Sequence, residues 1–395
     1  MTKISALALL AVLACPAAAA AQNQPEGRFR TGALSWTPTL MLRDAGTDSN
    51  VYDEPTNPKR DTLGVLAPQV DGVIHLAAAN LRFGAGADFV YFQRYTAERS
   101  INTRGNVRVD LRGWRFRPFG RASFLDSRER VNSEIDVRAR RADRDFGLGL
   151  GIQLTPRGVL EIGGSFNQST FRQGEIFRGV DLPRRLNRET VLGSIQFLYE
   201  ITPLTRFLVE GSASKDRFTL SPAYDARNVR GRVGVDFAPD ALLKGRATVG
   251  FHRLEPRGEL GLGFDGVTAG VELGYILLQR TRFDVRVTRD ASYSFEAQPY
   301  FLQTIYGGQV LHTLLERLDV FAQVSWETMD YPGIPERMIP ADTLDVTRYG
   351  GGVAIRPAPR VSMTINYELT ERAGHVTPSR QYDRRRVYTT VTYGF

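Results

Sequence analysis

Cysteine and lysine are scarce in this sequence, and each scarcity excludes a class of chemistry. The only cysteine, Cys15, lies in an apolar stretch at the N-terminus. Once that stretch is removed, the chain holds no disulfide, thiol nucleophile or cysteine-bound metal. Lysine then occurs only at Lys59, Lys215 and Lys244, so almost all of the positive charge is arginine. Guanidinium groups bind carboxylates and phosphates through paired hydrogen bonds, which makes such groups their expected partners.

Long hydrophobic runs are also missing beyond residue 21. No segment there approaches the roughly 18 consecutive apolar residues that a membrane-spanning helix needs. This absence excludes spanning helices but not spanning β-strands, in which apolar residues alternate with polar ones. The formal net charge is +8. In a secreted chain without a basic helix, that charge does not indicate nucleic acid as a partner.

The N-terminal stretch has the organisation of a secretory signal peptide. Residues 1–21 combine a positive start, an apolar run and small residues, and Ala19 and Ala21 form an A-x-A cleavage site. A retained membrane helix and a lipid attached to Cys15 are the alternatives, and the proline after the apolar run argues against the helix. We expect residues 22–30 to form a short periplasmic tail.

The last stretch of the chain alternates apolar and polar residues. Phe395, Tyr393 and Val391 fall on one face, and Thr392 and Thr390 fall on the other. A period of two is that of a β-strand. Such an ending resembles the C-terminal strand that the outer-membrane barrel-assembly machinery recognises, so Phe395 and Tyr393 are the expected assembly signal. The same alternation recurs at 33–43, 81–91, 229–237, 281–290 and 361–370.

The connections between these segments alternate between short and long. Short turns with Pro, Asn or charged residues are predicted at 78–80, 155–158, 202–205, 238–241, 278–280 and 357–360. Long polar loops are predicted at 44–61, 127–145, 172–188, 216–225, 255–264, 331–342 and 372–381. Outer-membrane barrels have short periplasmic turns and longer outer loops, which is the same arrangement.

These patterns predict an all-β fold, a single antiparallel transmembrane outer-membrane β-barrel over residues 31–395. We count about 18 strands, an even number because both termini are expected in the periplasm. The segments 62–76 and 299–315 alternate less regularly, so 16 strands is the alternative. No linker or shift in composition divides the barrel, and we expect one domain in the outer membrane of a Gram-negative cell.

Charged side chains in the alternating segments share the inward face. On the lipid face each would cost about 2–4 kcal/mol at the membrane midplane. An arginine-rich lumen attracts anions; the alternative is a ladder of arginine–carboxylate pairs that holds the wall together. The candidates for solute selection in the lumen are Arg108, Arg112, Arg230, Arg232, Arg246, Arg282, Asp284, Arg286, Arg384 and Arg386.

Other polar clusters give weaker signals. Arg138, Arg140, Arg141 and Arg144 fall in a predicted outer loop, where either lipopolysaccharide phosphates or solvent would surround them. The acidic loop at 44–61 lacks the spacing of a calcium loop. The four histidines are scattered and match no zinc or hydrolase motif. We therefore predict no metal, no cofactor and no enzymatic activity.

A short motif near the start of the barrel carries a family resemblance. An opening strand is followed by Ser49-Asn50-Val51-Tyr52, by Arg60-Asp61-Thr62 and by an apolar strand with Leu66-Ala67-Pro68. Together with the terminal strand pattern, this resembles the putative β-barrel porin 2 family, although the family's aromatic-Asp-Asp lead-in is only Thr47-Asp48 here. The resemblance implies an outer-membrane barrel with porin-like activity and brings no catalytic residues. Some relatives look associated with the export of surface polysaccharide.

Three functions remain as hypotheses. The first is a porin-like passive channel for small hydrophilic solutes, biased to anions, which an inward-folded loop would favour. The second is a non-conducting or accessory barrel for polysaccharide export, which charges paired across the lumen would favour. The third is an outer-membrane hydrolase, which a histidine beside a carboxylate or serine near the outer rim would favour. The expected partners are outer-membrane lipid and lipopolysaccharide, the assembly machinery, and solutes or polysaccharide, but not nucleic acid.

Overall fold

The computed structural model describes residues 28–257, 262–374 and 380–395. The expected signal peptide at 1–21 and most of the tail at 22–30 lie outside the described residues. The strands are β1 (Phe29–Thr31), β2 (Leu34–Asp48), β3 (Asp61–His75), β4 (Ala79–Phe92), β5 (Ser100–Leu111), β6 (Phe116–Arg130), β7 (Arg138–Thr155), β8 (Gly158–Phe171), β9 (Ile176–Phe177), β10 (Val180–Asp181), β11 (Arg188–Thr202), β12 (Thr205–Phe218), β13 (Ala226–Phe237), β14 (Leu243–Pro256), β15 (Phe264–Leu277), β16 (Thr281–Tyr293), β17 (Tyr300–Leu315), β18 (Leu318–Tyr331), β19 (Asp342–Ala358), β20 (Val361–Gly374) and β21 (Tyr382–Gly394). One short helix, α2 (Leu182–Leu186), and the 3-10 turns Thr96–Glu98, Pro222–Tyr224 and Pro335–Arg337 lie between them.

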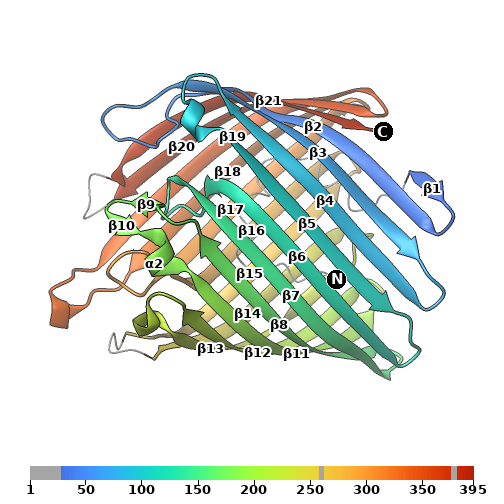
Figure 1. The fold of residues 1–395 in the computed structure, drawn as a ribbon. Helices are drawn as coiled ribbons and strands as arrows, with labels where there is room; N and C mark the ends of the chain where they lie inside the picture. The colour runs from blue at the N-terminus through green and yellow to red at the C-terminus, as the bar shows by residue number, and fades with distance from the viewer. Residues whose placement is uncertain (1–27, 258–261, 375–379) are drawn as a thin grey trace.

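Eighteen antiparallel strands close into one barrel. Figure 1 shows the strands side by side around the closed wall. Each long strand pairs with its neighbours in the sequence, and β2 closes the ring by pairing with β21. The sheet therefore has no free edge, which is what a β-structure in lipid requires. The prediction of about 18 strands is confirmed, because the two irregular segments form β3 and β17. The short strand β1 only adds a hairpin to the start of β2.

The two faces of the wall follow the alternation in the sequence. On β20, Ile365 and Tyr367 are 47% and 48% exposed, whereas Thr364 and Asn366, which alternate with them, are 3% and 6% exposed. Large apolar side chains cover the outer surface of the other strands in the same way. In a soluble protein such a surface would be unstable in water, but in a membrane it faces lipid. The inner, polar face surrounds the lumen.

The connections separate the barrel into two ends. Turns such as 156–157, 203–204 and 359–360 join strands at one end, here called the short-turn end, and the longer loops join them at the other, the loop end. Both described termini belong to the short-turn end, where the backbone N–H of Phe395 donates to the carbonyl of Pro38 at 3.3 Å. The Tyr393 and Phe395 rings stack edge to face with centroids 4.7 Å apart, and their role in assembly stays a prediction.

Several predicted loops are shorter than expected. Residues Arg138, Arg140, Arg141 and Arg144 belong to β7 and not to an outer loop, so that prediction was wrong. Polar residues obscure the strand pattern there because the strand extends past the apolar surface while still pairing with β6 and β8. Backbone pairing continues wherever a neighbouring strand is available, whatever the side chains are.

Candidate functional site

The loop between β6 and β7, residues 131–137, crosses the lumen and is called the inner loop below. Ser133 Oγ donates to Glu327 Oε2 of β18 at 2.5 Å, and Arg348 Nη2 of β19 donates to Ser133 Oγ at 2.7 Å. In the ring of strands, β6 and β7 lie on the side opposite to β18 and β19. The inner loop therefore reaches the far wall.

A buried carboxylate holds the middle of the inner loop. Glu134 is 0% exposed and accepts hydrogen bonds from Ser294 Oγ, from Tyr331 Oη at 3.1 Å and from the Phe295 backbone N–H at 3.4 Å. Burial raises the pKa of this carboxyl to about 7, although its hydrogen bonds and Arg380 act in the opposite direction. Because the donors come from β18 and from the loop after β16, this contact also spans the lumen.

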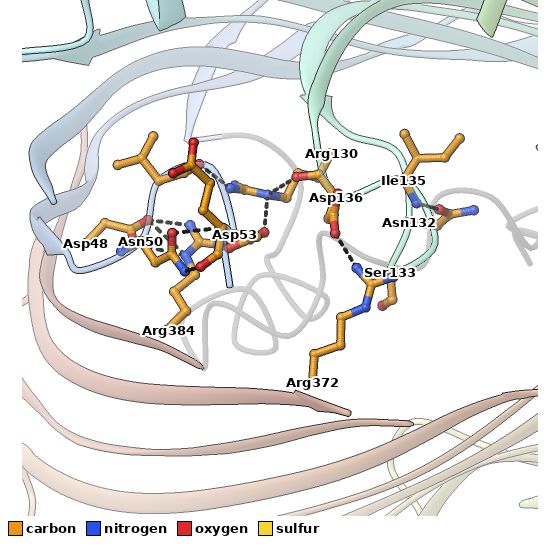
Figure 2. A network of polar contacts seen from close by, with 12 residues as sticks. Asp48, Asn50, Asp53, Arg130, Asn132, Ser133, Ile135, Asp136, Arg372 and Arg384 are labelled. Carbon is orange, nitrogen blue, oxygen red and sulfur yellow. Dashed lines mark hydrogen bonds and ion pairs between the residues drawn. The ribbon is translucent and has the colours of Figure 1, made fainter. Parts of the chain in front are cut away.

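The end of the inner loop is fixed by an arginine on the opposite wall. Arg372 of β20 forms an ion pair with Asp136, and the Arg372 side chain is fully buried. Burial raises the pKa of the Asp136 carboxyl above its ordinary value, although Arg372 acts in the opposite direction. Figure 2 shows Arg372 and Asp136 pointing toward each other from the strand and the loop. Breaking such a buried pair leaves an uncompensated charge, so the loop position is strongly specified.

A second loop, residues 49–60, is joined to the same network. Arg130 Nε lies 2.8 Å from Asp53 Oδ2, and Arg130 also donates to the carbonyl of Asp136 at 2.8 Å. On the other side Arg384 of β21 contacts both Asp48 and Asp53. Figure 2 shows this chain of polar contacts running from the first loop to the inner loop. The two loops therefore support one another.

Apolar packing covers the inner loop at the loop end of the barrel. Ile135 lies in one cluster with Phe171, Phe177, Leu182, Leu186 and Phe295, all buried. Helix α2 supplies the two leucines, and Asp181 before it is the N-cap, whose carboxylate accepts from the Arg184 backbone N–H at 3.1 Å. The loop end thus has its own small hydrophobic core.

The predicted arginines of the lumen wall are mostly paired with carboxylates. Arg282 lies 2.8 Å from Asp284, and Arg286 lies 3.3 Å from Glu272. Arg384 contacts Asp48, and Arg386 lies 2.7 Å from Asp44. This arrangement is the ladder of ion pairs that the sequence left as the alternative.

Besides Asp48, Asp53 and Glu98, four further carboxylates of the described residues are each shared by two arginines, so the pairing is not one to one. Asp88 contacts Arg43 and Arg104, and Asp110 contacts Arg82 and Arg108. The other two shared carboxylates are Asp236, with Arg206 and Arg246, and Asp290, with Arg230 and Arg232. Arg108, Arg230, Arg232 and Arg246 are among the predicted lumen residues. Arg108 and Asp110 lie two residues apart on β5, whereas the pairs of the other three arginines join different strands and could not be found from the sequence.

Arg112 differs from the other predicted residues in its partner. Its Nη2 donates to the neutral side-chain oxygen of Asn80 at 2.8 Å. Nearby Arg117, which sequence reasoning did not single out among the candidates, donates to the amide oxygen of Gln153. Both arginines lie at the short-turn end. Amide partners orient a guanidinium group without neutralising its charge.

A histidine beside a carboxylate does occur in the wall. His252 is 0% exposed, its Nδ1 lies 2.6 Å from Asp290 Oδ1, and its Nε2 lies 2.9 Å from Asn228 Oδ1. Asn228 Nδ2 donates to Asp216 at 2.5 Å, which fixes the amide orientation. Both ring nitrogens are therefore engaged by oxygen atoms, and neither is available to take a proton from a substrate. This histidine belongs to the wall.

Among the described parts of the chain, no helix has the length and apolar character needed to cross a membrane. Within the same residues, no group of three or more His, Cys, Asp or Glu side chains is placed to hold a metal ion. His375, one of the four histidines in the sequence, lies outside the described ranges.

The fold is similar to several solved outer-membrane porins. A BenF-like porin from Pseudomonas fluorescens Pf-5 matches with a TM-score of 0.55 and 8% identity, covering 92% of this chain and 99% of that one. OpdK from Pseudomonas aeruginosa, crystallised with vanillate, matches with a TM-score of 0.51 and 9% identity, covering 91% and 98%. At such identities the likeness concerns the fold alone. No curated protein matches the sequence.

A family model is matched by nearly the whole chain. The match covers residues 27–395, which include every described strand, and the family is described as Putative beta-barrel porin 2. The closed barrel, its apolar outer surface and its polar lumen agree with that description. This protein of the bacterial outer membrane therefore belongs to the Putative beta-barrel porin 2 family.

Proposed function

We propose that the protein is a passive channel for small hydrophilic solutes, with the inner loop as its narrowest part. The observation that carries the proposal is the set of contacts joining Ser133, Glu134 and Asp136 to the opposite wall. An 18-stranded barrel is wide enough to hold an aqueous lumen. A loop held across that lumen reduces its width without blocking it. Such a loop sets a fixed upper limit on the size of the solutes that pass.

The same proposal includes a preference for anions. Asp88, Asp110, Asp236 and Asp290 each have two arginines within 4.0 Å, so guanidinium groups outnumber carboxylates at these places. Low-dielectric walls focus the field of such charges into the lumen and raise the local concentration of anions. The termini and the short turns face the periplasm in this proposal, and solutes enter from the loop end.

Single-channel conductance of the refolded protein in a planar bilayer tests the proposal. Steady conductance steps are expected, and replacing residues 132–136 by a Gly-Ser linker of equal length should raise the conductance at least twofold, because the contacts with β18–β20 are lost. The matched control is Arg253→Gln, which removes an exposed ion pair with Asp265 outside the inner loop. A folded barrel without steps, or a linker variant with unchanged conductance, would overturn the proposal.

A salt gradient across the same bilayer tests the anion preference. The double variant Arg82→Gln/Arg108→Gln removes both arginines that share Asp110, and the reversal potential should shift toward cations. The variant Asp110→Asn should shift it toward anions. If both variants leave the reversal potential unchanged, the lumen charges do not select the solute.

One observation favours a second function, the non-conducting or accessory barrel. The apolar cluster around Ile135 and Phe295 and the buried loop contacts narrow the loop end of the barrel. A barrel closed there would give no steps in the wild type, and steps would emerge only in the linker variant. A hydrolase has less support, because the described histidine beside a carboxylate, His252, is enclosed in the wall.

A further inference from the structure

A hollow at the short-turn end of the lumen has an unusual lining. Its volume is about 450 Å³, and it lies where β4, β5 and β6 approach their turns. The lining residues are Asn80, Asp110, Leu111, Arg112, Gly113, Trp114 and Arg117. Two arginines, one aspartate, an amide and a tryptophan therefore surround a space the size of a small organic molecule.

The two arginines of the hollow are held by neutral groups. Arg112 donates to Asn80 Oδ1 at 2.8 Å, and Arg117 donates to Gln153 Oε1. Within the described residues, no ion pair of either guanidinium with a carboxylate is found. Each side chain is oriented by its amide partner, so part of the entropy cost of fixing it is met before a ligand arrives.

The one carboxylate in the lining is already engaged elsewhere. Asp110 Oδ2 accepts from Arg82 at 2.7 Å, and Asp110 Oδ1 accepts from Arg108 at 2.8 Å. Arg108 also lies over the Phe119 ring, 4.4 Å from its centroid, which holds it in place. Two guanidinium groups thus contact this carboxylate, and two more line the hollow beside it. The local charge is positive and accessible, since the Arg82 side chain is 55% exposed.

Trp114 adds an apolar surface beside these charges. It is 94% exposed, and it lies in the turn between β5 and β6 with Arg112 two residues before it and Arg117 three after it. An indole ring next to guanidinium groups suits a ligand with one flat apolar part and one anionic part.

We propose that this hollow is a binding site for small organic anions, in which Arg112 and Arg117 take the carboxylate or phosphate group and Trp114 contacts the apolar body. The proposal names a solute class for the channel and in that respect rests on the proposed function. Binding itself is independent of conduction, because the hollow lies at the mouth of the lumen and requires no passage past the inner loop.

Equilibrium titration of the folded protein in detergent micelles tests the site. Trp36 and Trp326 are replaced by Phe so that fluorescence reports on Trp114 alone, and the probes are sodium benzoate, inorganic phosphate and uncharged benzamide. Benzoate is expected to change the fluorescence saturably, and benzamide is expected to bind at least tenfold more weakly. Phosphate binding without a change in Trp114 fluorescence would support the arginines as the ligands of the anionic group. Equal binding of benzamide and benzoate would overturn the proposal.

Substitution of the arginines separates charge from geometry. Arg112→Gln/Arg117→Gln should weaken benzoate binding at least tenfold, and Arg112→Lys/Arg117→Lys should give an intermediate loss, because the charge stays while the paired donors are lost. Arg253→Gln is the control and should bind as the wild type does. Heat-modified migration on gels checks that each variant is a folded barrel. If the folded glutamine variant binds benzoate normally, the site is wrong, whether or not the wild type conducts.

Discussion

Two sets of arginines, one at each end of this barrel, have different surroundings. At the loop end, Arg384 is 14% exposed and its partner Asp48 is 1% exposed, with the two side chains joined by several hydrogen bonds. At the short-turn end, Arg112 and Arg117 are bound to neutral amides beside an open hollow. A paired and buried guanidinium stabilises the position of a loop. The charge of an exposed guanidinium with a neutral partner is not neutralised, so it can still attract an anionic ligand.

The difference follows from desolvation. Removing one member of a buried ion pair leaves the other charge without water or a partner, which costs about 3–5 kcal/mol. An exposed group in water loses little when its partner is removed.

Arg384→Ala should have the largest effect on stability. The substitution leaves Asp48 and Asp53 with fewer cationic partners at buried positions, and we expect the free energy of unfolding to fall by about 3 kcal/mol. Urea unfolding in lipid vesicles measures it. Arg112→Ala is the matched control at the other end and should change the free energy by less than about 0.5 kcal/mol. Equal losses in the two variants would remove the contrast between the ends.

The Asp136–Arg372 pair should show strong coupling. Either Asp136→Leu or Arg372→Met alone leaves a buried charge and should destabilise the barrel by about 2–3 kcal/mol. The double variant should lose less than the sum, because no charge remains. A double-mutant cycle measures the coupling, expected at about 1–3 kcal/mol. Additive losses would mean that the inner loop is not held by this pair.

The inner loop should also make stability depend on pH. Burial raises the pKa of Glu134 from 4.5 to about 7, so the folded protein binds this proton more tightly than the unfolded chain does. The resulting stabilisation is fully present below about pH 4.5 and is lost as the pH rises to about 7. Asp136 shifts in the same direction, while Arg185, Arg380 and Tyr331 face Glu134.

Unfolding at pH 5 and pH 8 measures this dependence. The wild type should be more stable at pH 5 by about 1–3 kcal/mol, since one unit of pKa corresponds to about 1.4 kcal/mol. Glu134→Gln has no proton to lose and should reduce the difference between the two pH values. If the free energy of unfolding of the variant changes with pH as much as that of the wild type, the pH dependence comes from other groups.

The smallest effect is expected at an exposed pair. Arg253 and Asp265 lie 2.9 Å apart, but their side chains are 55% and 47% exposed. Arg253→Gln should change the free energy of unfolding by less than about 0.5 kcal/mol, and high salt should remove even that difference. Thermal unfolding at low and high salt measures it. A loss comparable to that of Arg384→Ala would show that exposure does not determine how much these ion pairs contribute to the free energy of unfolding.

The sequence by itself determined the barrel. A side-chain period of two, repeated over many segments, can bury polar groups and expose apolar ones only if the sheet closes in lipid. The strand at 361–370 shows this, because its apolar face is the exposed one. The same pattern was unclear in β3 and β17, yet pairing with regular neighbours makes both of them strands. Local pattern failed at 138–144 because strands there extend beyond the apolar surface.

The partners of the charged side chains and the course of the inner loop depend on how the barrel closes. Ser133 meets Glu327 and Asp136 meets Arg372 across 194 and 236 positions of sequence. The alternation of apolar and polar residues shows which face of the strand a residue occupies. It carries no information on which side chains meet across a lumen. Likewise, the sequence placed Arg108 and Arg112 on one face, whereas the contacts of Arg82 with Asp110 and of Arg112 with Asn80 depend on the register between β4 and β5. That register sets which charges are neutralised and which are left for a solute.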